Sequence, residues 1–469
     1  MPSTVSASAQ SSTVSVPARL RVCVVGAGYV GLTAAACLAQ LGHRVRCVEV
    51  DTRRLAMIER GEMPIYEPGL AELVAAGVAS GDLGFSAEIG PALDGAEVAL
   101  LCVGTPPQPT GEPDLSYLAT AARQLAHEAT RDLIVVVKST VPPGSCEALE
   151  LVCAEESAPG VRIRVASSPE FLRESRAVED FMAPDRVVIG AADDEVADVV
   201  VRLYPTGAPV VRCDRRGAEL VKYASNTFLA IKVSFANEVA HLCEALGTDA
   251  GTVLAGVGGD HRIGPTFLRP GPGYGGSCLP KDVAGFIALG HSFGSPTLLA
   301  AAAEEQNIGA RTTVVDKLAT VLGSLVGRKI AVLGLAFKDG TDDTRDSPGL
   351  HIVDQLDEAG ATVRVFDPLV RDDPGRGQRM ATVDGAVAGV DAVVITTGAP
   401  EFRAVRPTVL ASAMEGNVVV DAAGVCDLEE WAAAGLVVYG VGRGVPVAFH
   451  PVVWTPLRWT EGSRVPVGS

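Results

Sequence analysis

Short apolar runs alternate with longer segments rich in Ala, Leu and Glu over the first half of the chain. Five runs predict strands, at residues 20–25, 44–50, 98–103, 133–138 and 187–190. Apolar runs without polar alternation are typical of strands buried on both faces of a sheet, as in parallel sheets. The segments between them predict the connecting helices of βαβ units. This part of the chain is therefore expected to form a parallel α/β sheet.

The pattern changes near residue 216, where a long helix is predicted. Residues 218–246 contain no Pro and no Gly, and apolar residues recur at helical spacing, which predicts a helix of about 43 Å. A second helical stretch is predicted over residues 296–322. The glycine-rich stretch 256–276 between them predicts a long irregular loop, and loops of that size are usually functional.

A second series of strands begins beyond residue 328, with runs at 329–334, 362–367, 391–397 and 417–421. The fold class predicted is α/β, with two Rossmann-like domains that contain parallel sheets and are joined by a central long-helix region. The predicted division is a disordered leader at 1–18, an N-terminal domain at 19–214, a central region at 215–325, a C-terminal domain at 326–445 and a tail at 446–469.

Composition narrows the class of protein. The chain has 469 residues, of which 48% are hydrophobic and 20% charged, which excludes a disordered protein. The net charge of −17 argues against a nucleic-acid partner. No apolar stretch is long enough to span a membrane. The ten cysteines form no CxxC pairs and the seven histidines show no metal-ligand spacing, so a reduced cytoplasmic protein without a metal site is expected.

A glycine motif follows the first predicted strand. Residues 26–31 read Gly-Ala-Gly-Tyr-Val-Gly and precede a helical pattern, which predicts a dinucleotide pyrophosphate at a helix N-terminus. Glu49 ends the next strand, where a carboxylate binds the ribose hydroxyls and favours NAD over NADP. Arg53 and Arg54 weaken that preference. The alternative is a glycine turn that binds no cofactor.

Two further strands end in polar turns. Gly104, Thr105 and Pro106 follow one strand and Thr140 follows another. Ligands of doubly wound sheets bind outside the carboxyl ends of the strands, so these residues are expected at the cofactor cleft. Ordinary strand-terminating turns are the alternative.

The segment 271–282 combines glycines with reactive side chains. Gly275 and Gly276 lie shortly before Cys278, and Lys281 and Asp282 follow it by three and four residues. A cysteine in a polar glycine-rich loop is accessible, which favours a nucleophile. The alternative is a buried cysteine that acts as a small hydrophobe, as expected for the other nine.

These motifs together resemble the UDP-glucose/GDP-mannose dehydrogenase family, from about residue 20 to residue 444. The resemblance rests on an ordered series of signatures, at residues 26–31, 103–106, 138–144 (Lys-Ser-Thr-Val-Pro-Pro-Gly), 168–174 (Ser-Pro-Glu-Phe-Leu-Arg-Glu), 222–228 (Lys-Tyr-Ala-Ser-Asn-Thr-Phe), 271–282 and 334–338 (Gly-Leu-Ala-Phe-Lys).

The resemblance implies an NAD-dependent four-electron oxidation of a nucleotide sugar at C6, through a cysteine thiohemiacetal and thioester. UDP-glucose, giving UDP-glucuronate, is the expected substrate, because Ser277 and residues 171–174 speak against 2-acetamido sugars and Gly273-Tyr274 against GDP-mannose. GDP-mannose and UDP-2-acetamido sugars stay open as alternatives. A simple two-electron dehydrogenase and a catalytically silent nucleotide-sugar-binding protein are alternatives of other classes.

The resemblance also implies roles for individual residues. Cys278 is the expected nucleophile, Lys222 and Asn226 stabilise oxyanion character, and the remaining catalytic residues order or activate water: Asp282, Glu170 and Thr140. For Glu170 and Glu174, the alternative is a pair of solvated charges on one helix. The implied cofactor contacts are Gly26, Gly28, Tyr29, Val30, Gly31, Glu49, Arg54, Gly104, Thr105, Pro106, Thr140, Glu174 and Arg345.

The implied substrate contacts extend over all three parts of the chain: Glu170, Phe171, Leu172, Lys222, Asn226, Arg262, Tyr274, Gly275 and Lys338. Arg262 resembles an arginine that reaches the sugar site of the partner subunit, which implies at least a homodimer formed through the helix at 218–246. For Arg262 and Arg345 the alternative is a surface ion pair.

Overall fold

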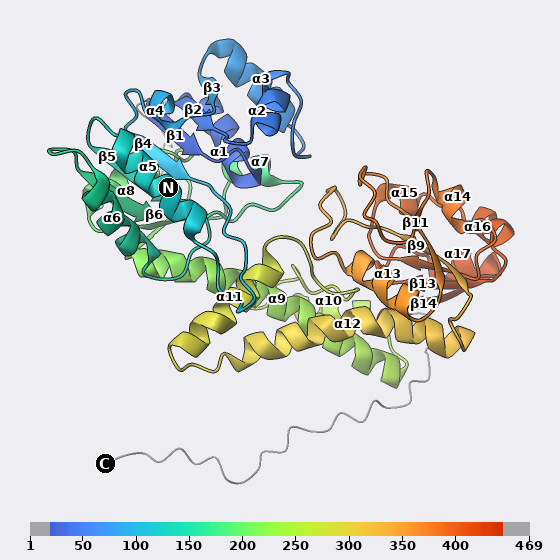
Figure 1. Ribbon diagram of the computed structural model, residues 1–469. Coiled ribbons are helices and arrows are strands. Elements are labelled where there is room, and N and C mark those ends of the chain that lie inside the picture. The colour runs from blue at the N-terminus through green and yellow to red at the C-terminus, as the bar shows by residue number, and fades with distance from the viewer. Residues whose placement is uncertain (1–18, 444–469) are drawn as a thin grey trace, which may run out of the picture.

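The computed structural model describes residues 19–443, and two α/β lobes are bridged by long central helices (Figure 1). The predicted leader at 1–18 and tail at 446–469 lie outside the described residues. The predicted fold class is confirmed, while the exact division into domains stays a prediction.

The N-terminal lobe contains an eight-stranded sheet in the order β3-β2-β1-β4-β5-β6-β7-β8. All five predicted strands are present. Three others were not predicted, because β3 contains a glycine, β6 an arginine, and β8 lies exposed at the edge of the sheet. The strands are β1 (Arg21–Val25), β2 (Arg44–Val48), β3 (Leu83–Ser86), β4 (Val98–Leu101), β5 (Leu133–Val137), β6 (Ile163–Ser167), β7 (Val187–Gly190) and β8 (Val210–Cys213).

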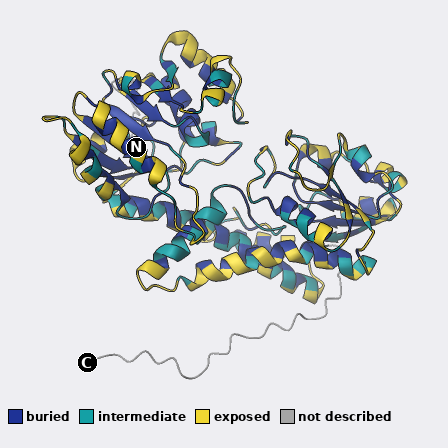
Figure 2. Ribbon diagram, viewed as in Figure 1, coloured by how far each residue is buried: buried dark blue, intermediate teal, exposed yellow. Residues whose placement is uncertain are grey.

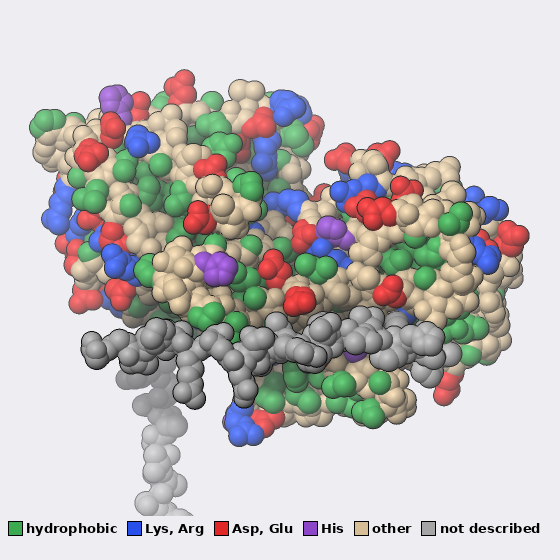
Figure 3. Space-filling model, turned by 60° about the horizontal axis from the view of Figure 1, so that its bottom comes forward, with side chains coloured by type: hydrophobic (Ala, Val, Ile, Leu, Met, Phe, Trp, Pro, Cys, Tyr) green, Lys and Arg blue, Asp and Glu red, His purple; other side chains and the backbone are tan. Residues whose placement is uncertain are grey.

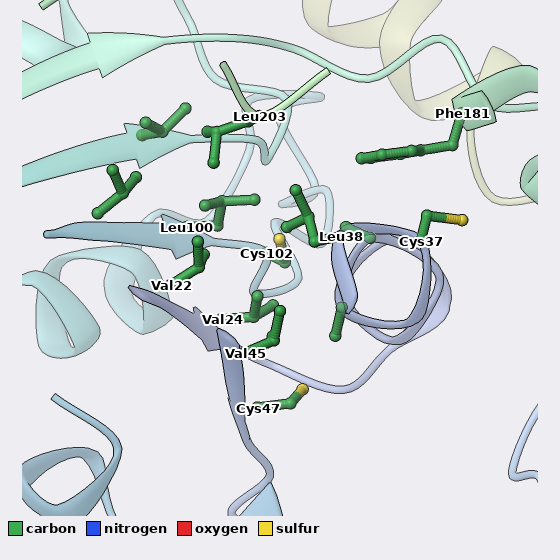
Figure 4. Packing of buried hydrophobic residues seen from close by; sticks show 14 of the residues in the cluster. Val22, Val24, Cys37, Leu38, Val45, Cys47, Leu100, Cys102, Phe181 and Leu203 are labelled. Carbon is green, nitrogen blue, oxygen red and sulfur yellow. The ribbon is translucent and has the colours of Figure 1, made fainter. Parts of the chain in front are cut away.

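Both faces of this sheet are buried, as the apolar runs predict. Val22 and Val24 of β1 pack into one hydrophobic cluster, and Cys23 and Val25 pack into another on the opposite face. Figure 2 shows most strands of both lobes as buried, and Figure 4 shows the first cluster from close by. The covering helices are α1 (Tyr29–Gln40), α2 (Thr52–Glu59), α3 (Leu70–Ser80), α4 (Ile89–Ala92), α5 (Ser116–Glu128), α6 (Ser145–Glu156), α7 (Ala177–Met182) and α8 (Asp194–Val201).

One strand pair departs from the predicted parallel pattern. β6 and β7 are antiparallel, with Ser167 paired to Gly190. Antiparallel neighbours need no crossover connection, so the chain turns back at the end of β6. Residues 168–174, which carry Glu170 and Glu174, therefore lie beyond the carboxyl end of β6.

The central region consists of α9 (Arg215–Leu246), α10 (Ala250–Gly258), α11 (Leu279–Ser292) and α12 (Leu298–Leu322). The first predicted long helix is confirmed; it begins three residues earlier than expected because the Asp214 side chain caps it by accepting from Gly217 N. The predicted loop is irregular from residue 259 onward, while its first residues belong to α10.

The α9 helix is fastened to both lobes. Near its start, the Glu219 carboxylate accepts hydrogen bonds from Gly144 N (2.7 Å) and Cys146 N (2.8 Å) of the N-terminal lobe. Near its end, Glu244 Oε1 accepts from Gly442 N (2.6 Å) at the end of the C-terminal lobe and from Lys317 Nζ (2.5 Å) of α12.

The C-terminal lobe contains a six-stranded parallel sheet in the order β11-β10-β9-β12-β13-β14. Its strands are β9 (Lys329–Leu333), β10 (Thr362–Phe366), β11 (Gln378–Arg379), β12 (Ala392–Ile395), β13 (Val418–Asp421) and β14 (Val437–Gly440). Its helices are α13 (Pro348–Glu358), α14 (Val383–Val387), α15 (Pro400–Arg403), α16 (Pro407–Ala413) and α17 (Leu428–Ala433).

The surface mixes charges of both signs. Figure 3 shows acidic and basic side chains interspersed with apolar ones over the visible part of one face. Between residues 19 and 443, no helix is long and apolar enough to cross a membrane. The same residues contain no group of three or more His, Cys, Asp or Glu side chains that could hold a metal ion.

Candidate active site

The glycine motif lies at the carboxyl end of β1, where the backbone is too crowded for side chains. Gly26 has a φ of +98°, and a Cβ at Gly31 would lie 1.8 Å from the Gly26 carbonyl oxygen. A Cβ at Gly26 would also lie 3.0 Å from the carbonyl oxygen of Cys102, which follows β4. The motif therefore brings the start of α1 close against β1 and β4, as the sequence predicts.

Gly28, in contrast to Gly26 and Gly31, lies beside open space. No atom lies within 4 Å of the position that its Cβ would take. Gly28 is the N-cap of α1, has no side chain to cap the helix, and no acidic residue lies in the first turn. The backbone N–H groups at the start of α1, including those of Tyr29 and Val30, thus belong to a positive helix end that fits a dinucleotide pyrophosphate.

The other predicted cofactor residues follow neighbouring strands along the same edge. Glu49 follows β2; it is buried, and its Oε1 accepts from Asp51 N at 2.9 Å. Gly104 and Pro106 flank Thr105, whose Oγ1 donates to the Thr140 carbonyl oxygen at 3.0 Å. Because β2, β1, β4 and β5 are adjacent in the sheet, these turns form one edge that fits an extended cofactor.

A cavity of about 570 Å³ lies where the three parts of the chain meet. Nine of the predicted catalytic, cofactor and substrate residues line it: Glu170, Phe171, Leu172, Glu174, Lys222, Asn226, Gly275, Cys278 and Lys338. The N-terminal lobe, α9, the Cys278 loop and the C-terminal lobe each contribute a wall.

Lys222 and Glu170 form a buried ion pair in this cavity. Lys222 Nζ donates to Glu170 Oε1 at 2.8 Å, and Leu172 N donates to Glu170 Oε2 at 2.6 Å. Burial disfavours the Glu170 carboxylate, but Lys222 and the Leu172 amide outweigh it and hold the pKa of Glu170 below its usual value. Burial opposes the charge of Lys222, but Glu170 and Asp282 together outweigh it and raise the pKa of Lys222. Both groups are therefore charged at neutral pH.

A second buried pair lies one turn further along α9. Asn226 Nδ2 donates to Asp282 Oδ2 at 2.6 Å, and Lys281 Nζ donates to Asp282 Oδ1 at 2.6 Å. Asp282 is fully buried on α11. The spacing of Lys222 and Asn226 places both on one face of α9, as predicted, and this face meets Glu170 on one side and Asp282 on the other.

Cys278 lies at the N-cap of α11 and lines the cavity. Burial and the Glu170 charge raise the pKa of its thiol, while Lys222 opposes the rise, so the resting sulfur is protonated at neutral pH. Ser277 Oγ lies 3.5 Å from Cys278 Sγ. Of the other nine cysteines, eight are buried as expected, while Cys213 is half-buried.

Glu174 links three parts of the chain. Its carboxylate lies 3.3 Å from Ser277 Oγ, 3.3 Å from Thr341 Oγ1 and 3.6 Å from the Arg345 guanidinium. Burial and the nearby Asp343 carboxylate raise the pKa of Glu174 to about 7. The alternative of solvated helix charges does not hold, because Glu170 and Glu174 are buried and no helix includes residues 168–174.

The remaining predicted substrate residues differ in their surroundings. Lys338 Nζ donates to the Glu174 carbonyl oxygen at 2.7 Å from the far side of the cavity. Tyr274 is buried outside the cavity lining, and its backbone is held by Asn307, whose side chain accepts from Tyr274 N at 2.6 Å. Gly275 has no room for a side chain, since its Cβ would lie 2.1 Å from the Asp346 carbonyl oxygen.

Several predicted residues lie away from the cavity. Arg262 is 78% exposed and forms an ion pair with Asp260 at 2.5 Å, so its action on a partner subunit stays a prediction. Arg345 is exposed beside Glu174 and also pairs with Asp343. Arg54 lies near the start of α2, where Asp51 accepts from its backbone N–H. Thr140 is half-buried at the sheet edge.

Sequence reasoning missed many residues of the cavity wall, among them Lys138, Arg186, Tyr204, Phe267 and Phe337. The Arg186 guanidinium lies 4.0 Å from the centre of the Phe171 ring. Phe267 has a φ of +66°, a backbone conformation that is strained for a bulky residue. Lys138 and Phe337 belong to quoted motifs, and a charged residue directly after a fully apolar strand was a signal that could have identified Lys138.

The chain was compared with known protein families and proteins once this geometry was established. Three models of the UDP-glucose/GDP-mannose dehydrogenase family match it: the NAD binding domain at residues 20–207, the central domain at 216–308 and the UDP binding domain at 331–428. The UDP-glucose 6-dehydrogenase TuaD of Bacillus subtilis is 38% identical, with 90% of this chain and 93% of TuaD covered.

Two further relatives give the same result. A UDP-glucose 6-dehydrogenase of Rhizobium meliloti is 40% identical over 90% of this chain and 100% of its own length. The structure of a UDP-glucose dehydrogenase from the hyperthermophilic archaeon Pyrobaculum islandicum matches with a TM-score of 0.85 at 39% identity, covering 92% of this chain and 99% of that chain.

The dinucleotide edge and the cysteine cavity beside it define an NAD-dependent dehydrogenase. The chain belongs to the UDP-glucose/GDP-mannose dehydrogenase family.

Glu49 is expected to set the preference for NAD over NADP. Glu49 is buried, and in its predicted position at the ribose end its carboxylate would repel a 2′-phosphate, so the wild type should use NAD about 100-fold better than NADP in kcat/KM. Glu49→Gln should lower this ratio by about tenfold, and Glu88→Gln, an exposed carboxylate on the same lobe, should leave it unchanged. An unaltered ratio in Glu49→Gln would place the discrimination elsewhere.

Proposed function

We propose that the protein oxidises UDP-glucose at C6 to UDP-glucuronate, with two NAD per sugar and a covalent intermediate on Cys278. The observation that carries the proposal is the cavity itself, in which a cysteine lies beside a buried Lys222–Glu170 pair and between the NAD binding and UDP binding domains. The relatives named for this reaction span nearly the whole chain.

The charges of the cavity fit a sugar nucleotide. Lys338, Arg186 and Lys222 all line it, and a diphosphate is recognised by ammonium and guanidinium donors. Phe337 and Phe267 add aromatic surface, which suits an apolar face of a base or sugar. We assign Phe171, Leu172 and Gly275 to the walls that orient the sugar, and Tyr274, whose backbone Asn307 holds, to the support of the neighbouring Gly275.

NAD, when bound, supplies the hydride acceptor for both oxidations. In the first oxidation, C6 loses a hydride and its hydroxyl passes a proton to a water molecule in contact with Glu170, so negative charge develops on the oxygen. The Lys222 ammonium and the Asn226 amide N–H lie on one face of α9 and stabilise that charge.

The aldehyde then reacts with Cys278. A bond forms between Sγ and C6, the carbonyl π bond opens, and the thiol proton ends on the former carbonyl oxygen. The thiohemiacetal again carries a hydrogen on C6, and loss of that hydride together with the hydroxyl proton gives a thioester. Water adds to the thioester carbon and the sulfur leaves, which yields the carboxylate and regenerates the thiol.

Hydrolysis requires a group that accepts a proton from water. Glu170 is ionised and faces the cavity, while Asp282 is fully buried behind Asn226. We assign the contact with water to Glu170, a supporting charge to Asp282, and a hydrogen bond to water to Thr140. Glu174 and Arg345 are assigned to the nicotinamide end and the phosphates of the cofactor.

The proposal includes an assembly and a location. Arg262 would complete the sugar site of a second subunit, and α9 would form the contact between the two, so the protein acts as a homodimer or a larger homo-oligomer. The free cysteines fit a cytoplasmic location.

Counting the NADH formed per sugar tests the proposal. With excess NAD and limiting UDP-glucose, two NADH per sugar and UDP-glucuronate as product are expected. One NADH per sugar would indicate a two-electron dehydrogenase. No turnover with UDP-glucose, but turnover with GDP-mannose or a UDP-2-acetamido sugar, would replace the substrate, and binding without turnover of any of them would indicate a silent binding protein.

A further inference from the structure

A buried lysine that the proposed chemistry does not use lies in the wall of the same cavity. Lys138 follows β5 directly, is 3% exposed, and lines the cavity. Its backbone N–H donates to the Leu101 carbonyl oxygen of β4 at 2.9 Å. The sheet thus fixes the Lys138 backbone, and the side chain extends from a rigid position.

The Lys138 ammonium differs from the other buried lysines in its partners. Lys222 pairs with Glu170, and Lys317 pairs with Glu244. No carboxylate of residues 19–443 lies within the 4.0 Å of a salt bridge to Lys138. A buried positive charge without an adjacent carboxylate costs free energy, so stability alone does not account for a lysine at this position.

The partner of Lys138 is a hydroxyl that leads to the catalytic segment. Lys138 Nζ donates to Tyr204 Oη at 2.8 Å, and Tyr204 Oη lies 2.6 Å from Ser168 Oγ. The Tyr204 ring stacks on Phe181 with 5.7 Å between the ring centres, which holds the hydroxyl in place. The chain of hydrogen bonds ends at Ser168, two residues before Glu170.

The charge of Lys138 also acts on Glu170. Burial opposes the ionisation of this carboxyl, and the pKa of Glu170 nevertheless lies below its usual value because of Lys222, the Leu172 amide and Lys138. Lys138 is therefore the second cation that favours the ionised form, and it does so without a direct ion pair.

We propose that Lys138 is a positioning residue of this active site: through Tyr204 and Ser168 it fixes the segment that carries Glu170, and it holds a second positive charge behind that carboxylate. The catalytic meaning of this inference rests on the proposed function. The contacts themselves predict an effect on Glu170 that is measurable without turnover.

The kinetic test separates the charge of Lys138 from its hydrogen bond. Lys138→Met removes both, Lys138→Arg retains the charge, and Tyr204→Phe retains the charge and the ring but removes the hydroxyl. Lys329→Met, on the exposed start of β9, is the matched control for the change in net charge. For each variant, kcat is measured from pH 3 to 9, so that the profile extends below the depressed pKa of Glu170, and UDP-glucose binding is measured by calorimetry.

Lys138→Met should lower kcat about tenfold. The acidic limb of its kcat–pH profile should move to higher pH by about half a pH unit, because the ionised Glu170 loses a favourable charge. Lys138→Arg should retain the wild-type limb. Tyr204→Phe should lower kcat about fivefold with the limb unmoved. The dissociation constant of UDP-glucose should change less than twofold in all of them. A wild-type limb in Lys138→Met, or wild-type kcat in Tyr204→Phe, would overturn the inference.

A second measurement does not depend on turnover. The thermal unfolding midpoints of Lys138→Met, Glu170→Gln and the double variant are compared at pH 8. If the charges of Lys138 and Glu170 interact, the change in midpoint of the double variant should differ from the sum of the two single changes. This difference should shrink at low pH, where Glu170 is protonated. Additive effects at pH 8 would overturn the inference even if the protein oxidised no UDP-glucose, whereas a failed proposed function with non-additive effects would leave it standing.

Discussion

Replacing Cys278 by serine is expected to lower the formation of UDP-glucuronate by about 10³-fold or more. The serine hydroxyl is a far weaker nucleophile than a thiol at the same position, so the aldehyde is not captured and the second oxidation has no covalent substrate. The measurement is the amount of NADH and of carboxylate formed per UDP-glucose, together with mass spectrometry of the protein quenched during turnover.

The matched control is Cys213→Ser, which changes the other cysteine that is not fully buried. This variant should retain wild-type stoichiometry, because Cys213 lies at the end of β8 and does not line the cavity. A sugar adduct on Cys278 should be trapped in the wild type and be absent from Cys278→Ser. Two NADH per sugar at the wild-type rate in Cys278→Ser would exclude the covalent route.

Lys222→Met is expected to have the second largest effect, on both activity and stability. Removing the ammonium withdraws charge stabilisation from the developing oxyanion, so kcat/KM should fall about 10²–10³-fold. It also leaves the Glu170 carboxylate buried without its ion-pair partner, which should lower the free energy of unfolding by about 3 kcal/mol at pH 8. Turnover assays and denaturant titrations measure the two effects.

The pH dependence of the stability loss has a defined sign. In the wild type the pKa of Glu170 is depressed, so its stabilising contribution is present above its unfolded pKa and is lost as the pH falls through the folded value. Without Lys222 the carboxyl binds a proton more readily, so the difference in stability should shrink at acidic pH. Glu170→Gln combined with Lys222→Met should recover part of the stability but none of the activity; recovery of turnover would contradict the role of Lys222.

Features that depend on one stretch of sequence were predictable here. Residues 26–31 lie at the end of a buried strand, and Lys222 and Asn226 share a helix face, because strand and helix periodicities fix these relations locally. Glu170 and Glu174 show the limit of such reasoning. Their spacing suits a helix, yet the antiparallel return after β6 places them in an irregular segment, and a single non-parallel strand pair leaves no mark on the hydrophobic pattern.

The composition of the cavity could not be predicted from local pattern. Arg186 and Phe267 reach it from segments whose sequence carries no motif of their own, and Phe337 reaches it from the other lobe. Their meeting depends on how the lobes pack onto α9 and on a strained backbone at Phe267. Such long-range packing has no signature in residue spacing.

Because α9 is attached to a different lobe at each end, its length sets the spacing and relative orientation of the two lobes. Glu219 and Glu244 hold opposite lobes, and about 38 Å of uninterrupted helix separates their backbones. One residue inserted between Glu219 and Glu244 would lengthen this part of α9 by about 1.5 Å and rotate one lobe against the other by about 100°. The number of residues between Glu219 and Glu244 is therefore constrained by the spacing of the two lobes, independently of which side chains the helix carries between them.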